Sequence, residues 1–441
     1  MIDQKEQKKV SFYTLGCKVN QYETEAMIEL FSNRGYLIGS FEEYADVYVI
    51  NTCTVTNVGD KKSRQMIRRA NKTNPGAPII VVGCYAQIAP EEISNIEGVT
   101  MILGTHQRAE IVDLFEEYQQ QQSPKVLVDN IMKIREFEEM SVSTLQDKTR
   151  AYLKIQEGCD RFCSYCIIPY ARGPVRSRSL ENIQKEINTL VLNGFKEIVL
   201  TGIHVGSYGK DLKGKTNLDL IALIEKIHEI KGLERIRLSS IEPTMITERF
   251  IEALQRLPKL CPHFHLSLQS GSNRTLRRMN RRYTKEIFEE KVRLLRKALP
   301  TVALTTDVIV GFPGETEEDF RESYEFVKKM QFSNIHVFPY SPKKGTPAAD
   351  FPDQLSNQMK EERSKRMIEL GEKLTTQFLA QYINTIQEVL FETETKEANE
   401  YEGHTSNYMK VTVKSLDPIV NTTQKVKVIS QRSDKLIGEI L

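Results

Sequence analysis

The sequence has no apolar segment long enough to span a membrane and no apolar core near its start. A transmembrane helix needs about 20 apolar residues, and the longest uncharged apolar stretches, near 47–59 and 77–90, are shorter. Residues 1–9 are polar, unlike a secretory signal peptide. We therefore expect a cytoplasmic protein with no membrane partner.

The sequence also lacks a strong net charge and an even number of cysteines. It carries 61 Lys and Arg against 59 Asp and Glu, a net charge of +2, which neither requires nor excludes a polyanionic partner. Seven cysteines in such a chain argue against a disulfide framework and for reduced thiols. Reduced thiols of this kind indicate a role in metal binding or catalysis.

The chain is long enough to form several domains. Its 441 residues correspond to about three domains. Up to about residue 345, runs rich in Val, Ile and Phe alternate with amphipathic stretches of helical length, which is typical of parallel sheets built from βα units. The predicted fold class is α/β, with an open parallel α/β domain over 1–140, a partial barrel of six βα units over 145–355, and a small OB-like β-barrel over 375–441.

Short apolar runs mark the individual strands. In the first domain the predicted strands are 10–15, 46–51 and 78–83, and a linker is expected over 119–147. In the second domain they are 152–156, 197–201, 235–239, 264–269, 305–310 and 334–338. The C-terminal strands include 409–414 and 425–429.

Three cysteines lie close together directly after the first strand of the second domain, in Cys159-Asp-Arg-Phe-Cys163-Ser-Tyr-Cys166. Structural zinc takes four protein ligands, and no histidine stands nearby to complete such a set. A 4Fe-4S cluster has four irons, usually with one thiolate each, so three cysteines would leave one iron open to an exogenous ligand. Buried structural cysteines and a zinc knuckle with a distant fourth ligand are the alternatives.

Three further cysteines each follow a predicted strand of the first domain. Cys17, Cys53 and Cys84 should converge, because the carboxyl ends of parallel strands lie on one edge of a sheet. Gly16 and Gly83, which lack a Cβ atom, would let the backbone approach a cluster closely. The alternative is that these are three unrelated core cysteines.

The spacing Cys-x-x-x-Cys-x-x-Cys after a first barrel strand resembles that of radical S-adenosylmethionine enzymes, and the resemblance covers about residues 145 to 345. With three spaced upstream cysteines and a small C-terminal β domain, nearly the whole chain resembles the methylthiotransferase family. The segment Leu15-Gly16-Cys17-Lys18-Val19-Asn20-Gln21 is most similar to the branch that acts on threonylcarbamoyladenosine in tRNA.

The resemblance implies two 4Fe-4S clusters and S-adenosylmethionine as cofactors. It implies that one cluster binds S-adenosylmethionine and that the other is auxiliary, with the ligand sets Cys159, Cys163, Cys166 and Cys17, Cys53, Cys84. The implied reaction is methylthiolation of carbon 2 of N6-threonylcarbamoyladenosine at position 37, in the anticodon stem-loop of ANN-decoding tRNA. A flavodoxin or ferredoxin would donate electrons, a TRAM-type C-terminal domain would bind RNA, and the sulfur donor is left open.

The resemblance also suggests residues near S-adenosylmethionine, while no catalytic side chain is assigned. These residues are Tyr165, Gly202, Ser239, Ser240, Glu242, Gln269, Gly311 and Gly314. The turn Thr201-Gly202-Ile203-His204 departs from the Gly-Gly-Glu stretch of many radical enzymes, which puts the contact to the methionyl amine in doubt. For the two later glycines, a plain βα turn is the alternative.

Two basic groups are predicted to contact RNA, because clustered Lys and Arg side chains bind phosphate. They are Lys61, Arg64, Arg68, Lys72 and Arg277, Arg278, Arg281, Arg282. A solvated helix face is the alternative for the first group. The alternative functions are another branch of the same family, acting on isopentenyladenosine in tRNA or on a ribosomal protein, and a non-catalytic iron-sulfur sensor that binds RNA.

Overall fold

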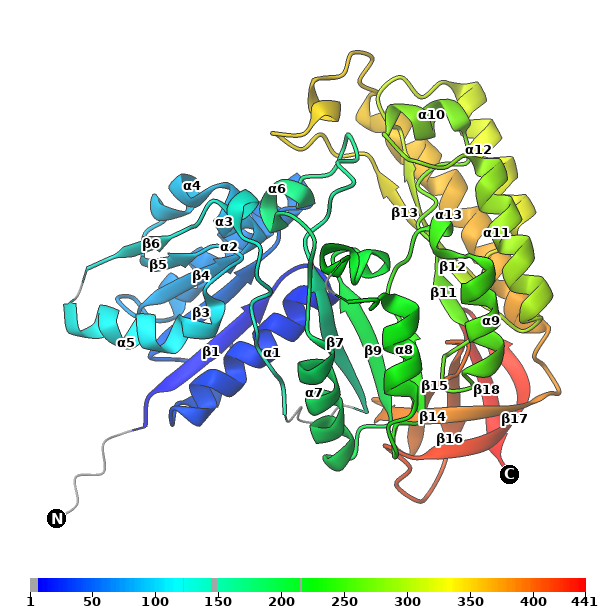
Figure 1. The fold of residues 1–441 in the computed structure, drawn as a ribbon, viewed down its shortest axis with the longest axis horizontal. Helices are drawn as coiled ribbons and strands as arrows, with labels where there is room; N and C mark the ends of the chain where they lie inside the picture. Colours follow the sequence, from blue (N-terminus) through cyan, green and yellow to red (C-terminus); the bar gives the residue numbers. More distant parts are fainter. Residues whose placement is uncertain (1–6, 122, 144–148, 215) are drawn as a thin grey trace.

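The computed structural model describes residues 7–121, 123–143, 149–214 and 216–441. An open parallel sheet, a curved partial barrel and a small closed barrel follow one another along the chain (Figure 1). The predicted α/β fold class, with its N-terminal parallel sheet and C-terminal β-barrel, is confirmed. No helix in these ranges is both long and apolar enough to cross a bilayer.

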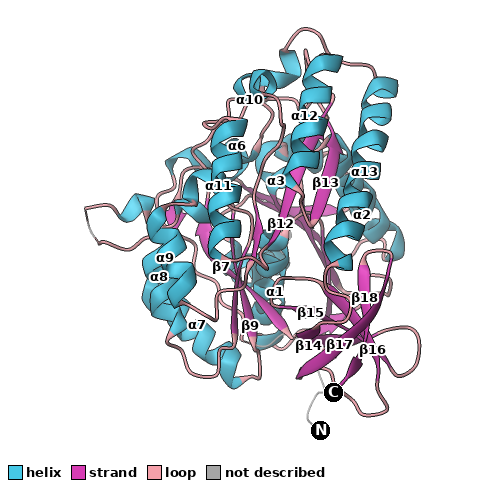
Figure 2. Ribbon diagram, turned by 90° about the vertical axis from the view of Figure 1, so that its right-hand side faces the viewer, coloured by secondary structure: helices cyan, strands magenta, loops and turns pink. Residues whose placement is uncertain are grey.

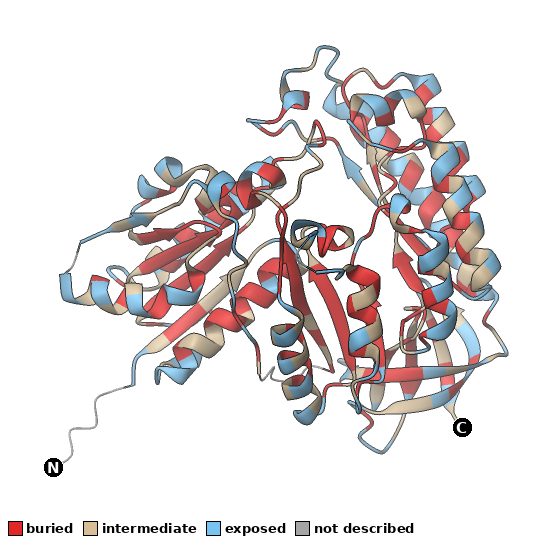
Figure 3. Cartoon of the chain, in the orientation of Figure 1, coloured by how far each residue is buried: buried red, intermediate tan, exposed pale blue. Residues whose placement is uncertain are grey.

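The N-terminal sheet has the strand order β2-β1-β3-β4-β5-β6, and all its pairs are parallel. The central strands β3 and β4 are buried along their whole length, as expected for parallel strands covered by helices on both faces (Figure 3). The strands are β1 Lys9–Thr14, β2 Leu37–Gly39, β3 Val47–Thr52, β4 Ile79–Gly83, β5 Val99–Leu103 and β6 Lys125–Leu127. The helices are α1 Lys18–Asn33, α2 Asn57–Thr73, α3 Cys84–Ile88, α4 Pro90–Ser94 and α5 Ile111–Gln121.

The expected linker over 119–147 is partly wrong. Residues 119–121 end helix α5, and the short strand β6 pairs with β5 as the edge of the sheet. A three-residue edge strand is too short to show an alternating pattern, so the sequence gives no sign of it. Residues 144–147 of this segment lie outside the described residues.

The central part forms the wall of a partial barrel from two parallel sheets. One sheet has the order β10-β9-β7, extended by the antiparallel strand β8, and the other has the order β11-β12-β13. Single bridges from Ile236 to Leu260 and from Ile241 to Leu266 join the two. The strands are β7 Arg150–Glu157, β8 Arg176–Ser177, β9 Glu197–Gly202, β10 Arg235–Leu238, β11 His263–His265, β12 Ala303–Val310 and β13 Asn334–Pro339.

Helices cover the outer face of this wall and share one hydrophobic core with it (Figure 2). They are α7 Leu180–Leu192, α8 Leu220–His228, α9 Glu248–Arg256, α10 Asn273–Arg278, α11 Lys285–Ala298 and α12 Glu317–Met330. The short helix α6 Ile168–Arg172 instead lies against α3 of the N-terminal domain. Local sequence fixes where several of them begin. Helix α12, for example, starts with a capping box between Thr316 and Asp319.

The predicted strand 264–269 is wrong over most of its length. Strand β11 ends at His265, and the chain then touches its neighbours only at single bridges. Gln269 has a φ of 68°, a left-handed conformation that cannot continue a strand.

Helix α13 (Asn357–Ala380) leads from β13 to a closed barrel of the order β14-β15-β16-β18-β17. Its strands are β14 Ile386–Glu394, β15 Glu400–Thr405, β16 Lys410–Lys414, β17 Thr423–Arg432 and β18 Lys435–Ile440. The barrel docks on the amino ends of β9 and β10. Arg237 reaches across this contact, with Nη1 3.0 Å from the carbonyl oxygen of Ser406 and Nε 2.6 Å from Glu197.

Candidate metal centre and cofactor site

The three N-terminal cysteines follow adjacent strands of the open sheet. Cys17 precedes α1 just after β1, Cys53 directly follows β3, and Cys84 directly follows β4 as the first residue of α3. A Cβ atom on Gly16 would lie 3.3 Å from the Sγ atom of Cys53, so the Cys17 and Cys53 turns touch. Burial and the two neighbouring thiols raise the pKa of Cys84 to about 12. The three thiols therefore lie at one edge of the sheet, and their role as a joint ligand set stays a prediction.

The glycine beside Cys84 is required by packing within the sheet. Gly83 has a φ of 96°, and a Cβ atom there would lie 2.4 Å from Oδ1 of Asn51 and 2.7 Å from the carbonyl oxygen of Thr52. Glycine is thus needed for the close approach of β4 to β3 at the point where the chain turns toward Cys84.

The other three cysteines lie on the loop after β7. The amide of Cys166 donates to the carbonyl oxygen of Cys163 at 3.0 Å, which makes the loop a tight turn. Burial raises the pKa of Cys159 to about 11 and that of Cys166 to about 12. Nη1 of Arg281 lies 3.3 Å from the Sγ atom of Cys163 and brings a positive charge to this thiol.

These donors fit an iron-sulfur cluster better than a single metal ion. All six thiols are free. Within the described residues, no set of three or more Cys, His, Asp or Glu side chains converges closely enough to hold one ion. In a 4Fe-4S cluster each thiolate binds its own iron, so three sulfurs around a common space suit it without meeting at one point. A bound metal would also favour the thiolate form that burial disfavours.

The residues predicted near S-adenosylmethionine fall into three places. Tyr165 lies on the cysteine loop and meets the turn after β12, because its ring packs edge-on against that of Phe312, the residue after Gly311, at 6.4 Å. Gly202 ends β9 and faces β7, where its Cβ position is 2.9 Å from the carbonyl oxygen of Gln156. Ser239 and Ser240 line a cavity farther down the barrel.

The two glycines after β12 are held by close packing as well as by turn geometry. Gly311 and Gly314 have φ values of 70° and 72°. Their Cβ positions lie 2.4 Å from Lys360 and 2.8 Å from Arg278. The turn interpretation accounts for both glycines, and their contact with S-adenosylmethionine stays a prediction.

Glu242 lies at the centre of an ion-pair group that joins the cysteine loop to the barrel. Its carboxylate oxygens are 2.8 Å from Nη2 of Arg161 and 3.2 Å from Nη2 of Arg281. Burial alone would raise its pKa, but the hydrogen bond with His204 and the nearby guanidinium groups lower it to about 2. The carboxylate is therefore ionised and fixes the arginine that contacts Cys163.

Comparison with known proteins supports this arrangement. Residues 153–327 match the family model described as the radical SAM superfamily, and residues 9–104 match one described as uncharacterized protein family UPF0004. The threonylcarbamoyladenosine tRNA methylthiotransferase MtaB of Bacillus subtilis (strain 168) is 50% identical, covering 95% of this chain and 93% of its own. Its namesake from Aquifex aeolicus (strain VF5) is 43% identical, covering 84% of this chain and 89% of its own. This chain belongs to the radical S-adenosylmethionine methylthiotransferase family.

Other relatives of this methylthiotransferase differ in their named substrate or only share its fold. The tRNA-2-methylthio-N(6)-dimethylallyladenosine synthase of Clostridium botulinum (strain Langeland) is 35% identical, covering 97% of this chain and 95% of its own. The radical S-adenosylmethionine methyltransferase TsrM of Kitasatospora setae has a TM-score of 0.55 and 16% identity, over 78% of this chain and 77% of its own. That last likeness shows the fold alone. S-adenosylmethionine and two 4Fe-4S clusters are the cofactors of the family, in agreement with two sets of three thiols.

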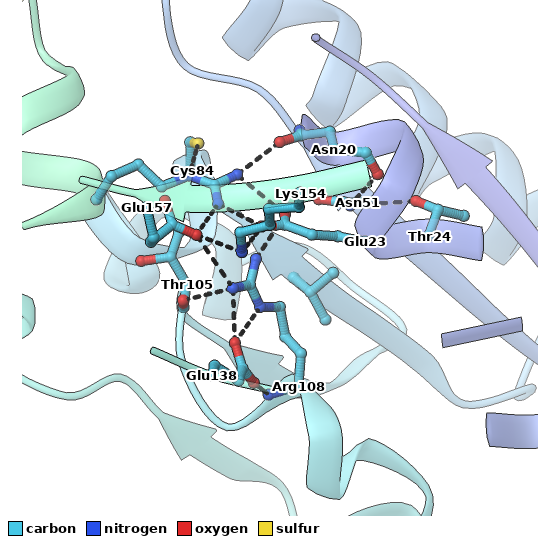
Figure 4. Close-up of polar contacts among 12 residues, drawn as sticks. Asn20, Glu23, Thr24, Asn51, Cys84, Thr105, Arg108, Glu138, Lys154 and Glu157 are labelled. Atoms are coloured by element: carbon cyan, nitrogen blue, oxygen red, sulfur yellow. Dashed lines mark hydrogen bonds and ion pairs between the residues drawn. The ribbon is translucent and has the colours of Figure 1, made fainter. Parts of the chain in front are cut away.

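A buried ion-pair network joins the N-terminal sheet of this methylthiotransferase to the partial barrel and reaches Cys84 (Figure 4). Arg172, which ends α6 shortly after Cys166, has its Nε atom 3.1 Å from the Sγ atom of Cys84. Its Nη2 donates to Oδ1 of Asn20 at 2.6 Å, and its Nη1 donates to Glu23 at 2.6 Å. One guanidinium group from α6, the helix that follows the cysteine loop, therefore touches a thiol of the N-terminal domain.

The network balances its charge internally. Its cations are Arg108, Lys154 and Arg172, and its carboxylates are Glu23, Glu138 and Glu157. Charges removed from water are tolerated only when they are paired and hydrogen-bonded. Sequence analysis did not find this network. Its only signal is the presence of charged residues inside predicted buried segments, such as Lys154 in the middle of β7.

The basic group 277–282 is partly reassigned. Arg281 is half-buried against Cys163 and Glu242, and Nε of Arg278 donates to the carbonyl oxygen of Pro313 at 3.0 Å. These two side chains hold the site together instead of facing RNA, whereas Arg277 and Arg282 are exposed. In the first basic group, Lys61, Arg68 and Lys72 are exposed on α2, and Arg64 donates to the hydroxyl of Tyr85 at 2.7 Å.

Proposed function

We propose that this protein methylthiolates carbon 2 of N6-threonylcarbamoyladenosine at position 37 of tRNA. The observation that carries the proposal is the pair of three-thiol groups, each able to hold a cluster with one iron free of protein ligands, in a chain 50% identical to a threonylcarbamoyladenosine tRNA methylthiotransferase. An unactivated aromatic C–H cannot be broken by any side-chain acid or base of ordinary pKa. The reaction therefore requires a cofactor to break this C–H bond.

We assign the ligands of the two clusters by their position. The set Cys159, Cys163 and Cys166 would hold the cluster that binds S-adenosylmethionine, and the set Cys17, Cys53 and Cys84 the auxiliary cluster. When bound, S-adenosylmethionine at a reduced cluster supplies radical chemistry, and the auxiliary cluster supplies a place for the transferred sulfur. Of the residues predicted near S-adenosylmethionine, we propose Tyr165 at the adenine. We propose Gly202, Glu242, Gln269, Gly311 and Gly314 around the rest of the cofactor, whereas Ser239 and Ser240 line the cavity farther down the barrel.

The chain itself contributes charge and position at both ligand sets. Arg281 and Arg172 bring positive charge to Cys163 and Cys84, and a hydrogen bond from a cation stabilises a thiolate. Both guanidinium groups are held by carboxylates, Glu242 and Glu23 respectively. Two arginines fixed in this way orient one sulfur in each set before any cluster is bound.

The proposed partners are the anticodon stem-loop of ANN-decoding tRNA and a flavodoxin or ferredoxin as electron donor. The exposed cations of α2, namely Lys61, Arg68 and Lys72, support contact with RNA phosphates beside the Cys53 turn. We also propose the domain division 1–140, 145–355 and 375–441, since the three β-structures fall inside these ranges. The cytoplasmic location stays a prediction.

The test uses anaerobically reconstituted protein, tRNA bearing threonylcarbamoyladenosine, and mass spectrometry of the digested nucleosides. The wild-type protein should form the methylthio product and release 5′-deoxyadenosine. Cys163→Ala should abolish both activities, whereas Cys53→Ala should still cleave S-adenosylmethionine and make no methylthio product. Cys261→Ala, which removes a buried thiol outside both sets, is the matched control and should keep both activities.

Three results would overturn the proposal. Equal loss of cleavage in Cys163→Ala and Cys53→Ala would show that the two ligand sets do not divide the work. A methylthio product on isopentenyladenosine tRNA or a ribosomal protein, and none on threonylcarbamoyladenosine tRNA, would move the protein to another branch of the family. No release of 5′-deoxyadenosine by a protein with both clusters bound would favour the sensor.

A further inference from the structure

A cavity of about 490 Å³ lies between the partial barrel and the C-terminal barrel. Its walls come from β10 to β13, helix α13 and the first residue of α1, and its floor comes from the loop between β15 and β16. The volume is within the range of small-molecule sites, roughly 300–1,000 Å³. Only five of its 21 lining residues are apolar, which is unusual for such a site and indicates a polar ligand.

Two buried polar atoms in the cavity wall lack a hydrogen-bond partner among the described residues. They are Oγ of Ser239 and Nδ1 of His263. The two side chains are only 8% and 6% exposed, so water does not reach them freely. Buried polar atoms are nearly always paired in native proteins, and an exception calls for an explanation. A polar ligand in the cavity would supply both partners.

The cavity also holds one unpaired cation and one fixed carboxylate. Lys18 is half-buried, and its ammonium group lies 5.9 Å from the centre of the Tyr152 ring, with no ion-pair partner among the described residues. Across the cavity, Oδ2 of Asp307 lies 3.0 Å from Nε2 of His265, whose ring stacks on that of His336 at 5.9 Å. The pocket therefore offers a positive group for an anion and a carboxylate for a hydrogen-bond donor.

Two lining residues tie the cavity to the cysteine groups along the chain. Lys18 directly follows Cys17, and Ser240 precedes by two residues Glu242, the carboxylate that pairs with Arg281 beside Cys163. Segments that carry or support both cysteine groups therefore also build the cavity wall.

We propose that this cavity binds the threonylcarbamoyl group of the substrate, with Lys18 pairing with its carboxylate and Asp307 accepting a hydrogen bond from its hydroxyl or carbamoyl N–H. The proposal rests on the proposed function and adds residues that set specificity. An isopentenyl group has no polar atom to offer Lys18, Asp307 or Ser239. A site built for hydrogen bonds discriminates strongly against an analogue that leaves its polar groups unpaired.

The test compares two synthetic anticodon stem-loops of identical sequence, one with threonylcarbamoyladenosine and one with plain adenosine at the same position. Dissociation constants are measured by fluorescence anisotropy on reconstituted full-length protein. Lys18→Met and Asp307→Asn should each weaken binding of the modified RNA by roughly 10- to 100-fold, the effect of one hydrogen bond to a charged group. Binding of the plain RNA and RNA-free cleavage of S-adenosylmethionine should stay within about twofold of wild type, since neither uses this charge.

The controls separate this proposal from the function it rests on. Lys226→Met removes an exposed lysine of α8 and should change neither dissociation constant. Lys18→Met could weaken binding by disturbing the cluster ligand Cys17 beside it. Asp307→Asn controls for this effect, because residue 307 is remote in sequence from every proposed ligand. If wild-type protein methylthiolates the modified RNA while both variants bind it normally, the cavity assignment is wrong and the proposed function stands. If wild-type protein makes no methylthio product on it, both are wrong.

Discussion

Replacing Glu23 by glutamine tests whether the buried network holds the N-terminal sheet to the partial barrel. The Glu23 carboxylate is fully buried and lies 2.6 Å from Arg108, 2.6 Å from Arg172 and 2.7 Å from Lys154. Glu23→Gln leaves three buried cations facing two carboxylates. Breaking a buried pair in this way costs about 3–5 kcal/mol, because an uncompensated charge stays out of water.

The assay is thermal and urea unfolding under anaerobic conditions. A loss of that size lowers the midpoint by roughly 6–20 °C for a cooperative unit of 150–250 residues. Glu117→Gln, which breaks the exposed pair with Lys125, is the matched control and should cost at most about 1 kcal/mol. The double variant Glu23→Gln/Lys154→Met restores the charge balance and should recover part of the loss.

The same residue gives a pH criterion. Burial alone would raise the pKa of Glu23, but Arg108, Arg172 and Lys154 outweigh it and hold the pKa well below 4.5. A carboxyl with a lowered folded-state pKa contributes its full stability above the unfolded pKa of about 4.3 and loses it only as the pH falls toward the folded value. The difference between wild type and Glu23→Gln should therefore be constant from about pH 6 to 8. A cost below about 1 kcal/mol, with no recovery in the double variant, would refute the reasoning.

Gly83→Ala should lower the free energy of unfolding by about 1–3 kcal/mol through backbone strain at its φ of 96°, and further because the new Cβ atom would meet β3. Unchanged unfolding and iron content would contradict this. Arg237→Met leaves Glu197 without its closest partner and should speed proteolysis of the C-terminal barrel, detected as a shorter fragment on gels; wild-type cleavage rates would count against the docking contact. Asp60→Asn removes the carboxylate that pairs with buried Lys343 and should cost about 3–5 kcal/mol in urea unfolding, whereas a cost near zero would mean that the pair is not structural.

The elements that the sequence predicts well are those with long periodic patterns. The strands now seen as β1, β3, β4 and β12 lie within two residues of the expected positions, because buried apolar runs mark them directly. The edge strand β6 escapes prediction because it is short and pairs on one side only.

Side-chain partners are harder to predict than strands. Arg281 has the same local sequence context as Arg282, yet one contacts Cys163 and the other is exposed. A run of arginines indicates positive charge, but whether a given guanidinium group meets phosphate or a buried carboxylate depends on residues far away in the chain, here Glu242. The cavity beside Lys18 is likewise assembled from segments more than two hundred residues apart, which no local pattern reveals.

The loop that carries Tyr408 forms the floor of that cavity, although it lies almost four hundred residues along the chain from Lys18. A polypeptide truncated at the end of α13 would keep the six cysteines proposed as cluster ligands but would lack this floor. Such a truncation would therefore separate the proposed cluster ligands from the proposed selection of the modified base.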